Sequence, residues 1–477
     1  DIYTGDIIAM YSSPSYNPNL FLFGISQDEW QLIRNNPLKP LVNKTLSGLY
    51  SPGSTIKPIV ALSALENKVI DTKFKVKCTG KMELYGQTFH CWKEKGHGWV
   101  SLRNAMKQSC DTYFYEVSRL LGVDKLNITA EKFGLGKKVL GNYFDTEKKG
   151  LFPNTVWKKN NLGKGWVLGE TLITGIGQGY TQTTPLQLCM MTAQIANGGY
   201  LIKPKIIVDS NPISYEDAKQ SMESGLLFDT DSEELLDKKL FKNQRNIKIV
   251  QEAMFASTNE RFGTSYKSRI DDPKYQFAGK TGTAQVKRIT EKQRELDLPL
   301  SEIPYEERDH ALYVAYGPYA NPRYAVSIVV EHAGSGSIAA APIAKKLFKL
   351  VIDRHDLREK KRLEKEKKLG IINIDAHFDL RPLLEGGKGS SGTPACITTS
   401  LKQIPPELVW FKSICCSFLV PPNIYRARGR GWLLMPEIAS PKLSIAIIGI
   451  NGPNNSSCIK GSFRSLTSIS VGLIRLS

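Results

Sequence analysis

A Pro-Gly turn leads into an apolar helical pattern in the stretch Tyr50-Ser-Pro-Gly-Ser-Thr-Ile-Lys-Pro-Ile-Val-Ala-Leu-Ser-Ala-Leu-Glu66. Ser54 and Lys57 stand three residues apart, which on a helix places both side chains on one face, with roughly 5–6 Å between Cβ atoms. Serine needs an adjacent base to act as a nucleophile, and a lysine can be that base where burial or a neighbouring cation lowers its pKa. Pro58 fits only the first turn of a helix, so Ser54 is predicted to lie at the N-terminal end of that helix, where backbone N–H groups stabilise an oxyanion.

Two later motifs strengthen this interpretation, because a Ser-x-x-Lys pair is weak evidence alone and recurs at Ser457-Cys-Ile-Lys460 without a helical pattern. Ser109-Cys-Asp111 precedes an aromatic run, and Lys280-Thr-Gly-Thr283 precedes Ala284-Gln-Val286, whose alternation predicts a strand. The order Ser-x-x-Lys, Ser-x-Asp/Asn, Lys-Thr-Gly is that of penicillin-recognising serine enzymes.

The similarity extends beyond these motifs. The segments Thr4–Met10, Gly175–Tyr180 and Glu331–Ser337 resemble the opening, glycine-rich and closing segments of class B penicillin-binding protein transpeptidase domains. Over about residues 1–352 the chain is most similar to the penicillin-binding protein 2 subgroup. The resemblance implies an α+β fold over residues 1–354, in which an antiparallel sheet is flanked by helices. The predicted order of helices, strands and a final helix at 343–353 agrees with such a layered arrangement.

The resemblance also implies a role for each motif residue. Ser54 would attack the acyl carbonyl with Lys57 as general base, and Ser109 would relay a proton toward the leaving amine. Lys280 and Asp111 would hold that serine. On the predicted strand, the residues that would bind substrate are Thr281, Gly282 and Thr283, and the backbone N–H groups of Ser54 and Thr283 would form the oxyanion hole.

The implied activity is that of a peptidoglycan D,D-transpeptidase, which cross-links stem peptides through an acyl-enzyme on Ser54 and is a target of β-lactams. The implied partner is a membrane glycosyltransferase of the elongation machinery, which maintains cell shape. Three alternatives use the same motifs: a D,D-carboxypeptidase, a β-lactamase and a β-lactam sensor. An inactive truncated remnant is the alternative from outside the enzymes.

The place of action is also implied by the resemblance. The sequence has no signal peptide and no apolar run of 18 or more residues. Relatives carry a membrane helix and a pedestal domain before the transpeptidase domain, whereas this sequence starts inside that domain. We therefore expect a fragment or the product of a broken reading frame. The active enzyme would work at the periplasmic face of the bacterial inner membrane.

Four residues form a candidate metal site: Cys78, Cys91, His97 and Cys110 offer three thiols and an imidazole, a common ligand set of structural zinc. Some members of the penicillin-binding protein 2 subgroup carry zinc in this segment, although the chemistry itself requires no cofactor. Cys110 lies inside Ser109-x-Asp111, so a metal would stiffen the catalytic loop. A Cys78–Cys91 disulfide and buried free thiols are the alternatives.

The character of the chain changes after residue 354. Residues 355–369 alternate acids and bases and are predicted to be a charged linker. Residues 370–394 resemble a fragment of the arginase and formimidoylglutamase family, with Asp375, His377 and Asp379 at its manganese-ligand positions. No Asp or His follows Asp379, so we predict no functional metal site there. Residues 395–477 are unassigned and show no period that predicts a fold.

Composition limits the domain organisation and the classes of partner that the chain can have. The chain has 477 residues, 41% of them hydrophobic, which suffices for a sizeable core and more than one domain. The formal net charge of +18 would suit nucleic acid. Because Lys and Arg are dispersed and no nucleic-acid-binding module is present, we predict no nucleic-acid partner, and instead a solvated basic surface near anionic lipid or cell-wall polymer.

Overall fold

The computed structural model describes residues 1–141, 143–207, 215–223, 226–229, 234–237, 239–241, 243–287 and 298–364, and beyond these five strands between residues 370 and 449. Two units are distinguished along the chain. The first comprises Asp1–Ser15, Ile33–Val208 and Ile213–Asp356 and contains every predicted catalytic and metal-binding residue. The second comprises Tyr16–Leu32, Asp209–Pro212 and Leu357–Ser477.

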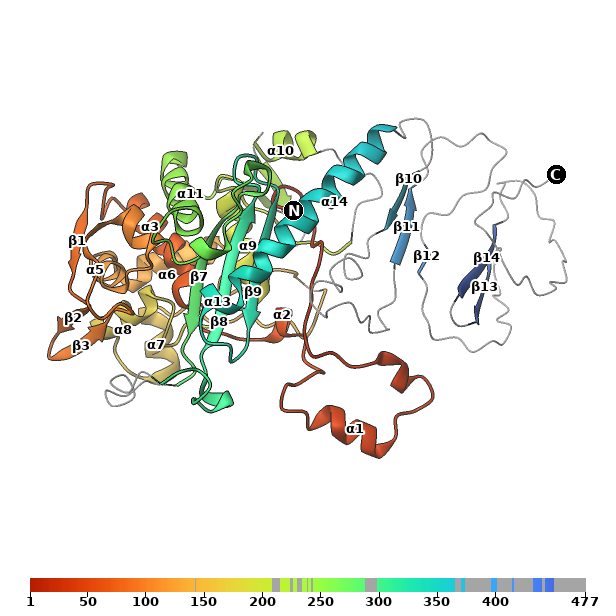
Figure 1. The fold of residues 1–477 in the computed structure, drawn as a ribbon, viewed down its shortest axis with the longest axis horizontal. Coiled ribbons are helices and arrows are strands. Elements are labelled where there is room, and N and C mark those ends of the chain that lie inside the picture. Colours follow the sequence, from red (N-terminus) through yellow and green to blue (C-terminus); the bar gives the residue numbers. More distant parts are fainter. Residues whose placement is uncertain are drawn as a thin grey trace. The chain divides into compact units, whose positions relative to one another are not determined.

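A three-stranded antiparallel sheet lies at the centre of the first unit (Figure 1). Its strands are β7 (Ala278–Ala284), β8 (His310–Gly317) and β9 (Tyr324–Val330), in the order β7-β8-β9. The predicted strand with the Lys-Thr-Gly motif is present, but it does not extend over the alternating residues to Val286. The motif Lys280–Thr283 itself pairs with β8, and the strand ends at Ala284, after which the Val286 N–H donates to the Asp309 side chain instead.

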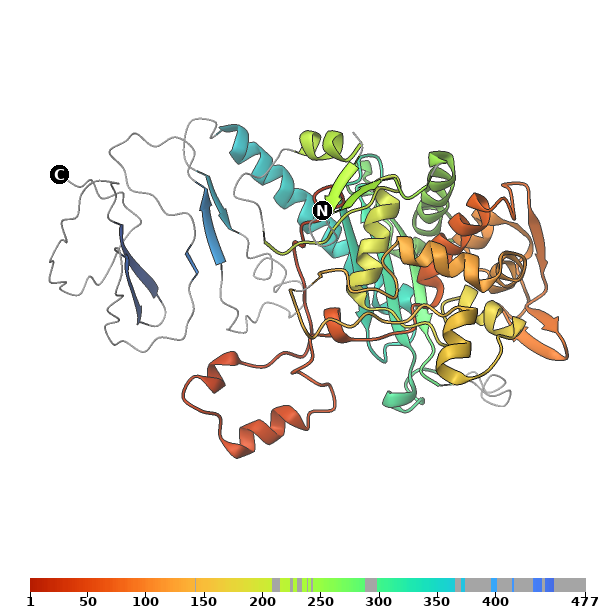
Figure 2. The same ribbon diagram turned by 180° about the vertical axis from the view of Figure 1, so that it is seen from behind.

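Alternation along β8 explains why helices cover both faces of this sheet. Leu312, Val314 and Tyr316 belong to the main core, whereas the intervening residues pack with Phe348 and Ile352 of α14 (Ala341–Glu364). Because side chains alternate between the two faces of a strand, each face needs its own cover. Figures 1 and 2 show α14 on one face and α9 (Pro185–Ala196) on the other. The predicted α+β fold with a helix-flanked antiparallel sheet is confirmed.

The Ser54 stretch forms a 3-10 turn, η2 (Gly53–Ile56), followed by α3 (Lys57–Glu66). Pro58 lies in the first turn of α3, as predicted, because its missing N–H has no intrahelical acceptor there. Every residue of α3 except Glu66 is buried. A helix that is buried all round belongs to the interior of a domain, so its position is set by packing.

Two helices flank Gly122 after the Ser109 motif, α5 (Asp111–Leu121) and α6 (Val123–Lys132). Helix α11 (Gln244–Asn259) packs against α3 and β7. The remaining helices of the described residues are α1 (Gln27–Arg34), α2 (Lys44–Ser47), α4 (Leu102–Lys107), α7 (Thr155–Leu162), α8 (Leu168–Gly175), α10 (Tyr215–Glu223) and α13 (Gly336–Ala339), with 3-10 turns η1 (Pro18–Phe21), η3 (Tyr266–Ser268), η4 (Pro273–Tyr275) and η5 (Tyr305–Glu307).

Antiparallel pairs make up the other described strands. The first unit contains β1 (Lys75–Cys78) with β4 (Gly98–Ser101), β2 (Lys81–Leu84) with β3 (Gln87–His90), and β5 (Leu226–Asp229) with β6 (Glu234–Asp237). The second unit contains β10 (Gly370–Asn373), β11 (Cys396–Ser400), β12 (Ile414–Cys415), β13 (Trp432–Ala439) and β14 (Lys442–Gly449). The predicted manganese-ligand positions Asp375, His377 and Asp379 lie outside the described residues. No described helix is both long enough and apolar enough to cross a membrane.

Candidate active site

The Ser54 turn lies directly against strand β7. Gly53 has a φ of +54°, and a Cβ built on it would lie 2.4 Å from the Thr283 carbonyl oxygen. On the other side its N–H donates to the Gly177 carbonyl at 2.9 Å. A side chain at position 53 would force these segments apart, so glycine is required by both its conformation and the close approach. Ser54 itself is half-buried, and its carbonyl accepts the Lys57 N–H.

Lys57 is fully buried and its ammonium group has three acceptors. Its Nζ donates to the Ser109 carbonyl at 2.9 Å, to Ser109 Oγ at 3.2 Å and to Asp111 Oδ1 at 2.7 Å. Among the described residues no hydrogen bond joins this amine to the Ser54 hydroxyl, so the role of Lys57 as general base stays a prediction. A buried cation binds a carboxylate more strongly than a neutral hydroxyl, so Asp111 takes the lysine.

Ser109 lies between two lysines. Its φ of 55° is in the left-handed region, which is uncommon for a residue with a side chain. Its hydroxyl is 3.2 Å from Lys57 Nζ and 2.8 Å from Lys280 Nζ. Lys280 comes from β7 and is also fully buried. Burial, followed by the nearby charge of Lys57, holds the pKa of Lys280 well below its usual value. The lysine with the lowered pKa is therefore Lys280.

Asp111 begins α5, and three contacts hold it. One carboxylate oxygen accepts from Lys57, and the other accepts from the Trp92 backbone N–H at 3.0 Å. Its own N–H donates to Cys91 Sγ at 3.3 Å. The indole N–H of Trp92 donates to the Gln108 carbonyl at 3.0 Å, so the Cys91–Trp92 segment borders the Ser109 motif on two sides. Asp111 therefore acts as an acceptor in this site.

Strand β7 brings the predicted substrate-binding residues to one edge of the sheet. The order β7-β8-β9 leaves β7 paired on one side only. Thr281 Oγ1 donates to Thr264 Oγ1 at 2.8 Å, and the Thr283 carbonyl accepts the Gln178 side-chain amide at 2.9 Å. Gly282 is again required by close approach, because an added Cβ would lie 2.7 Å from Thr55 Cγ2.

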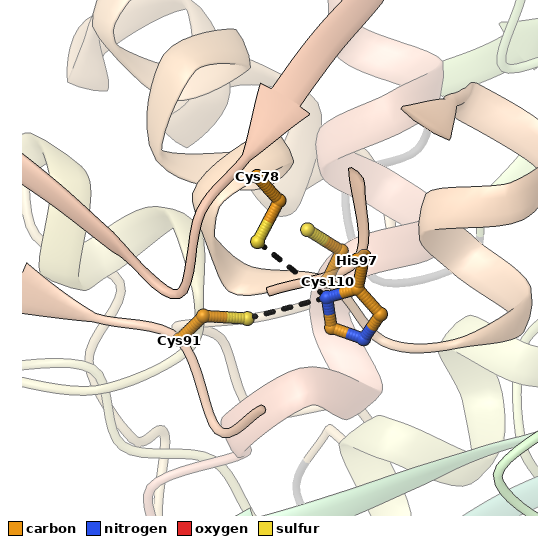
Figure 3. Close-up of side chains that lie close together, drawn as sticks. All are labelled: Cys78, Cys91, His97 and Cys110. Atoms are coloured by element: carbon orange, nitrogen blue, oxygen red, sulfur yellow. Dashed lines mark hydrogen bonds between the residues drawn. The ribbon is translucent and has the colours of Figure 1, made fainter. Parts of the chain in front are cut away.

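The four predicted metal ligands meet beside this site, with all four ligand atoms within 4.8 Å of one another (Figure 3). Cys78 Sγ and Cys91 Sγ lie 3.5 and 3.6 Å from His97 Nδ1. Zinc–sulfur and zinc–nitrogen bonds of tetrahedral sites give a sulfur-to-nitrogen separation of about 3.5 Å. Cys78, Cys91 and Cys110 are free thiols in the structure. The residues therefore fit a structural zinc ion.

Hydrogen bonding within this cluster shifts the pKa values of its members in opposite directions: that of Cys91 falls, and those of Cys110 and His97 rise. Hydrogen bonding from Cys110, opposed by burial, lowers the pKa of the Cys91 thiol. Burial alone would lower the pKa of His97, but its hydrogen bonds with Cys91 and Cys78 raise it. Since zinc binds thiolates, a thiol that ionises readily favours binding.

Some residues around the site carried no signal in the sequence. Thr264 and Trp92 reach Thr281 and Asp111 from loops 17 and 19 residues earlier in the chain, and no local pattern marks such contacts. Gln178 is different, because its place in the glycine-rich segment that resembled the family marks it in the sequence as a candidate to line the cleft or to hold the turn.

Glu331, the residue after strand β9, binds two residues that precede the Ser54 turn. Glu331 pairs with Lys44 and accepts the Tyr50 hydroxyl at 2.8 Å. Burial alone would raise the pKa of Glu331, but the hydrogen bonds from Lys44 and Tyr50 lower it. We expect Glu331→Gln to lower the free energy of unfolding by about 1–2 kcal/mol at neutral pH, a value below that of a fully buried pair because the site is partly solvated.

The pH dependence tests the cause. A carboxyl with a lowered folded pKa stabilises the fold above its unfolded pKa, and this contribution is lost as the pH falls through the folded pKa. Urea unfolding should therefore show a difference between wild type and Glu331→Gln that shrinks well below the ordinary carboxyl pKa of 4.5. The exposed Glu302→Gln is the matched control. A difference that persists in acid would mean that Glu331 acts through packing alone.

Comparison with known proteins identifies the protein family of this chain. The family described as penicillin binding protein transpeptidase domain matches residues 1–349. The chain therefore belongs to this family. Its relatives are of the penicillin-binding protein 2 (MrdA) type. Peptidoglycan D,D-transpeptidase MrdA of Acinetobacter baumannii is 35% identical over 347 residues, which is 72% of this chain and 48% of that protein. MrdA of Escherichia coli K12 is 32% identical over 347 residues, 70% of this chain and 50% of that protein.

Solved structures give the same result. Pseudomonas aeruginosa PBP2, in complex with WCK 5153, is 37% identical with a TM-score of 0.62, over 73% of this chain and 71% of that one. Helicobacter pylori PBP2, in complex with MreC, is 30% identical with a TM-score of 0.61, over 75% of this chain and 59% of that one. The chain spans about half the length of the two MrdA relatives described above.

Proposed function

We propose that this chain is a peptidoglycan D,D-transpeptidase domain that transfers an acyl group through Ser54. The single observation that carries the proposal is the meeting of Lys57 and Lys280 on the Ser109 hydroxyl. Gly53, the residue before Ser54, lies directly against Thr283 of β7, the strand that also carries Lys280. The relatives named as D,D-transpeptidases support the same reaction.

The hydrogen bonds support a route for the proton. Lys57 is bound as an ammonium group, so it must lose a proton before it can accept one from Ser54. Ser109 joins its Nζ to that of Lys280, the amine whose pKa is lowered. The Lys57 proton therefore passes through Ser109 to Lys280, and Asp111 stabilises the positive charge that the two lysines share. A general base of this kind contributes about 10²- to 10⁴-fold to a rate.

The acyl transfer has two stages, acylation of Ser54 and attack on the resulting ester. Ser54 Oγ bonds to the carbonyl carbon of the penultimate D-alanine and gives its proton to Lys57, and backbone N–H groups of Ser54 and Thr283 bind the oxyanion. The peptide bond then breaks, and the terminal D-alanine leaves with a proton from Ser109, which takes in exchange the proton that Lys57 holds. An amine of a second stem peptide attacks the ester carbonyl, and its proton passes through Lys57 to Ser54 Oγ as the ester bond breaks. The hydroxyls of Thr281 and Thr283 and the cation of Lys280 suit the substrate carboxylate.

We also propose that Cys78, Cys91, His97 and Cys110 bind one structural zinc ion. Bound there, zinc would supply a rigid cross-link without taking part in the reaction. Cys110 lies between Ser109 and Asp111, and Cys91 accepts the Asp111 N–H, so the site fixes the catalytic loop through its own ligands.

The related proteins provide the basis for a proposal on partners and cellular location. The H. pylori relative was solved with MreC, and a relative at 28% identity belongs to a peptidoglycan synthase complex that couples polymerisation and crosslinking. We propose that the whole protein works with a membrane glycosyltransferase of this machinery on peptidoglycan, at the periplasmic face of the inner membrane.

Intact mass spectrometry after incubation with benzylpenicillin tests the proposal. We expect one adduct that maps to Ser54 and persists, and none in Ser54→Ala. Incubation with a stem pentapeptide and an acceptor amine should release D-alanine and form a cross-linked product. Rapid turnover of the β-lactam without a lasting adduct would favour a β-lactamase, and release of D-alanine without cross-linking would favour a carboxypeptidase. A folded wild-type sample without an adduct would contradict the proposal.

A further inference from the structure

Strand β7 has a free edge, and its exposed acceptors are already occupied. The carbonyl of Thr281 accepts Lys280 Nζ at 3.0 Å, and the carbonyl of Thr283 accepts Gln178 Nε2 at 2.9 Å. These two residues are two positions apart, so their carbonyls point to the same edge of the strand. Since β8 pairs with the opposite edge, both acceptors face the side from which a further strand could approach.

An incoming acyl donor must use this edge. The Ser54 turn abuts Thr283. A peptide whose carbonyl carbon reaches Ser54 therefore runs beside β7. Extended peptides bind sheet edges by donating amide N–H groups to the free carbonyls. The Thr283 carbonyl is the acceptor nearest to the Ser54 turn, and Gln178 presents to it the same kind of amide N–H that a peptide would bring.

The backbone of Gln178 is held by close packing and a hydrogen bond, whereas its side chain makes a single hydrogen bond among the described residues. Gly177 has a φ of +75°, and a Cβ built on it would lie 2.2 Å from the Gly53 carbonyl oxygen. The Gln178 N–H donates to the Ile173 carbonyl at 3.1 Å. The Gln178 side chain is half-buried, and its one hydrogen bond among the described residues is to Thr283. A change of side-chain rotamer can therefore release the acceptor without moving the turn.

We propose that Gln178 is a specificity-determining residue that holds the Thr283 carbonyl by its side-chain amide and yields it to an amide N–H of the acyl donor. This inference rests on the proposed function and concerns the same site. A donor with an amide at that position has to displace Gln178 and replaces the lost hydrogen bond, whereas a donor without one leaves Gln178 in place. Gln178 thus reduces the advantage that an amide gives a donor, and so sets how strongly the site discriminates peptide-like donors from other reactive carbonyl compounds.

Two β-lactams with the same fused ring system separate the amide from the rest of the ligand. Benzylpenicillin carries an acylamino group, and penicillanic acid has hydrogen at that position. We expect Gln178→Ala and Gln178→Leu to raise the second-order acylation constant for benzylpenicillin about two- to tenfold, because one net hydrogen bond no longer competes. The constant for penicillanic acid should stay unchanged. Time courses of the intact mass measure both constants.

Gln182→Ala is the matched control, since Gln182 is an exposed glutamine in the same segment and its backbone alone pairs with Leu151. Thermal melting verifies that the variants fold. Equal changes for both β-lactams, or none, would overturn the inference, because a glutamine that merely holds the turn affects both ligands alike. Failure of the wild type to form an adduct on Ser54 would instead refute the proposed function, so the two failures are distinguishable.

Discussion

Lys57→Ala is expected to slow the acylation of Ser54 by benzylpenicillin by about 10²- to 10⁴-fold, the range that a positioned general base contributes. The substitution also removes the cation that faces Asp111 in a buried site. Breaking such a pair costs about 3–5 kcal/mol, so a loss of activity could reflect unfolding. The variant therefore has to be measured together with its free energy of unfolding.

Lys57→Arg separates the two effects. Arginine keeps the positive charge beside Asp111 but stays protonated, so it cannot serve as a base. We expect this variant to fold and to acylate as slowly as Lys57→Ala, as measured by the time course of the penicillin adduct. Lys73→Ala, which removes an exposed lysine beyond the end of α3, should acylate at the wild-type rate. Rapid acylation by Lys57→Arg would show that the base is another group.

The sequence predicts those features that depend on local pattern. The turn before α3 and the first-turn position of Pro58 follow from side-chain type and spacing, and the structure contains them. The extent of the strand at the Lys-Thr-Gly motif was not predictable, because Lys280–Thr283 carries polar side chains and glycine and does not alternate as a half-buried strand does. These residues form a strand because tertiary pairing with β8 outweighs local preference.

The residues of the site were predictable by type, but their hydrogen bonds were not. The spacing of Ser54 and Lys57 describes one turn, and it contains no information on the carboxylate that competes for the lysine. Asp111 arrives from another helix, and Lys280 is brought by a strand more than two hundred residues away along the chain. Charge balance in a buried site is a property of the assembled fold, so the choice of which lysine has the lowered pKa appears only there.

Removal of zinc is expected to weaken both the fold and the acylation. Elemental analysis of the purified wild type should find one zinc ion per chain. A chelator should lower the free energy of unfolding by at least about 3 kcal/mol, because the binding free energy of a structural zinc site is also folding free energy. It should also slow the formation of the penicillin adduct, because Cys110 and Cys91 hold the loop that carries Ser109 and Asp111.

Cysteine variants identify the source of this effect. Cys78→Ser removes a ligand without touching Asp111, and we expect it to lose zinc and to acylate slowly. Cys189→Ser alters a free cysteine outside the cluster and should keep its zinc and its acylation rate. Because a serine in place of Cys78 preserves size but lacks the soft sulfur that zinc prefers, a loss confined to the cluster variant can be attributed to the metal. Wild type without zinc, or acylation that is indifferent to chelation, would contradict the assignment.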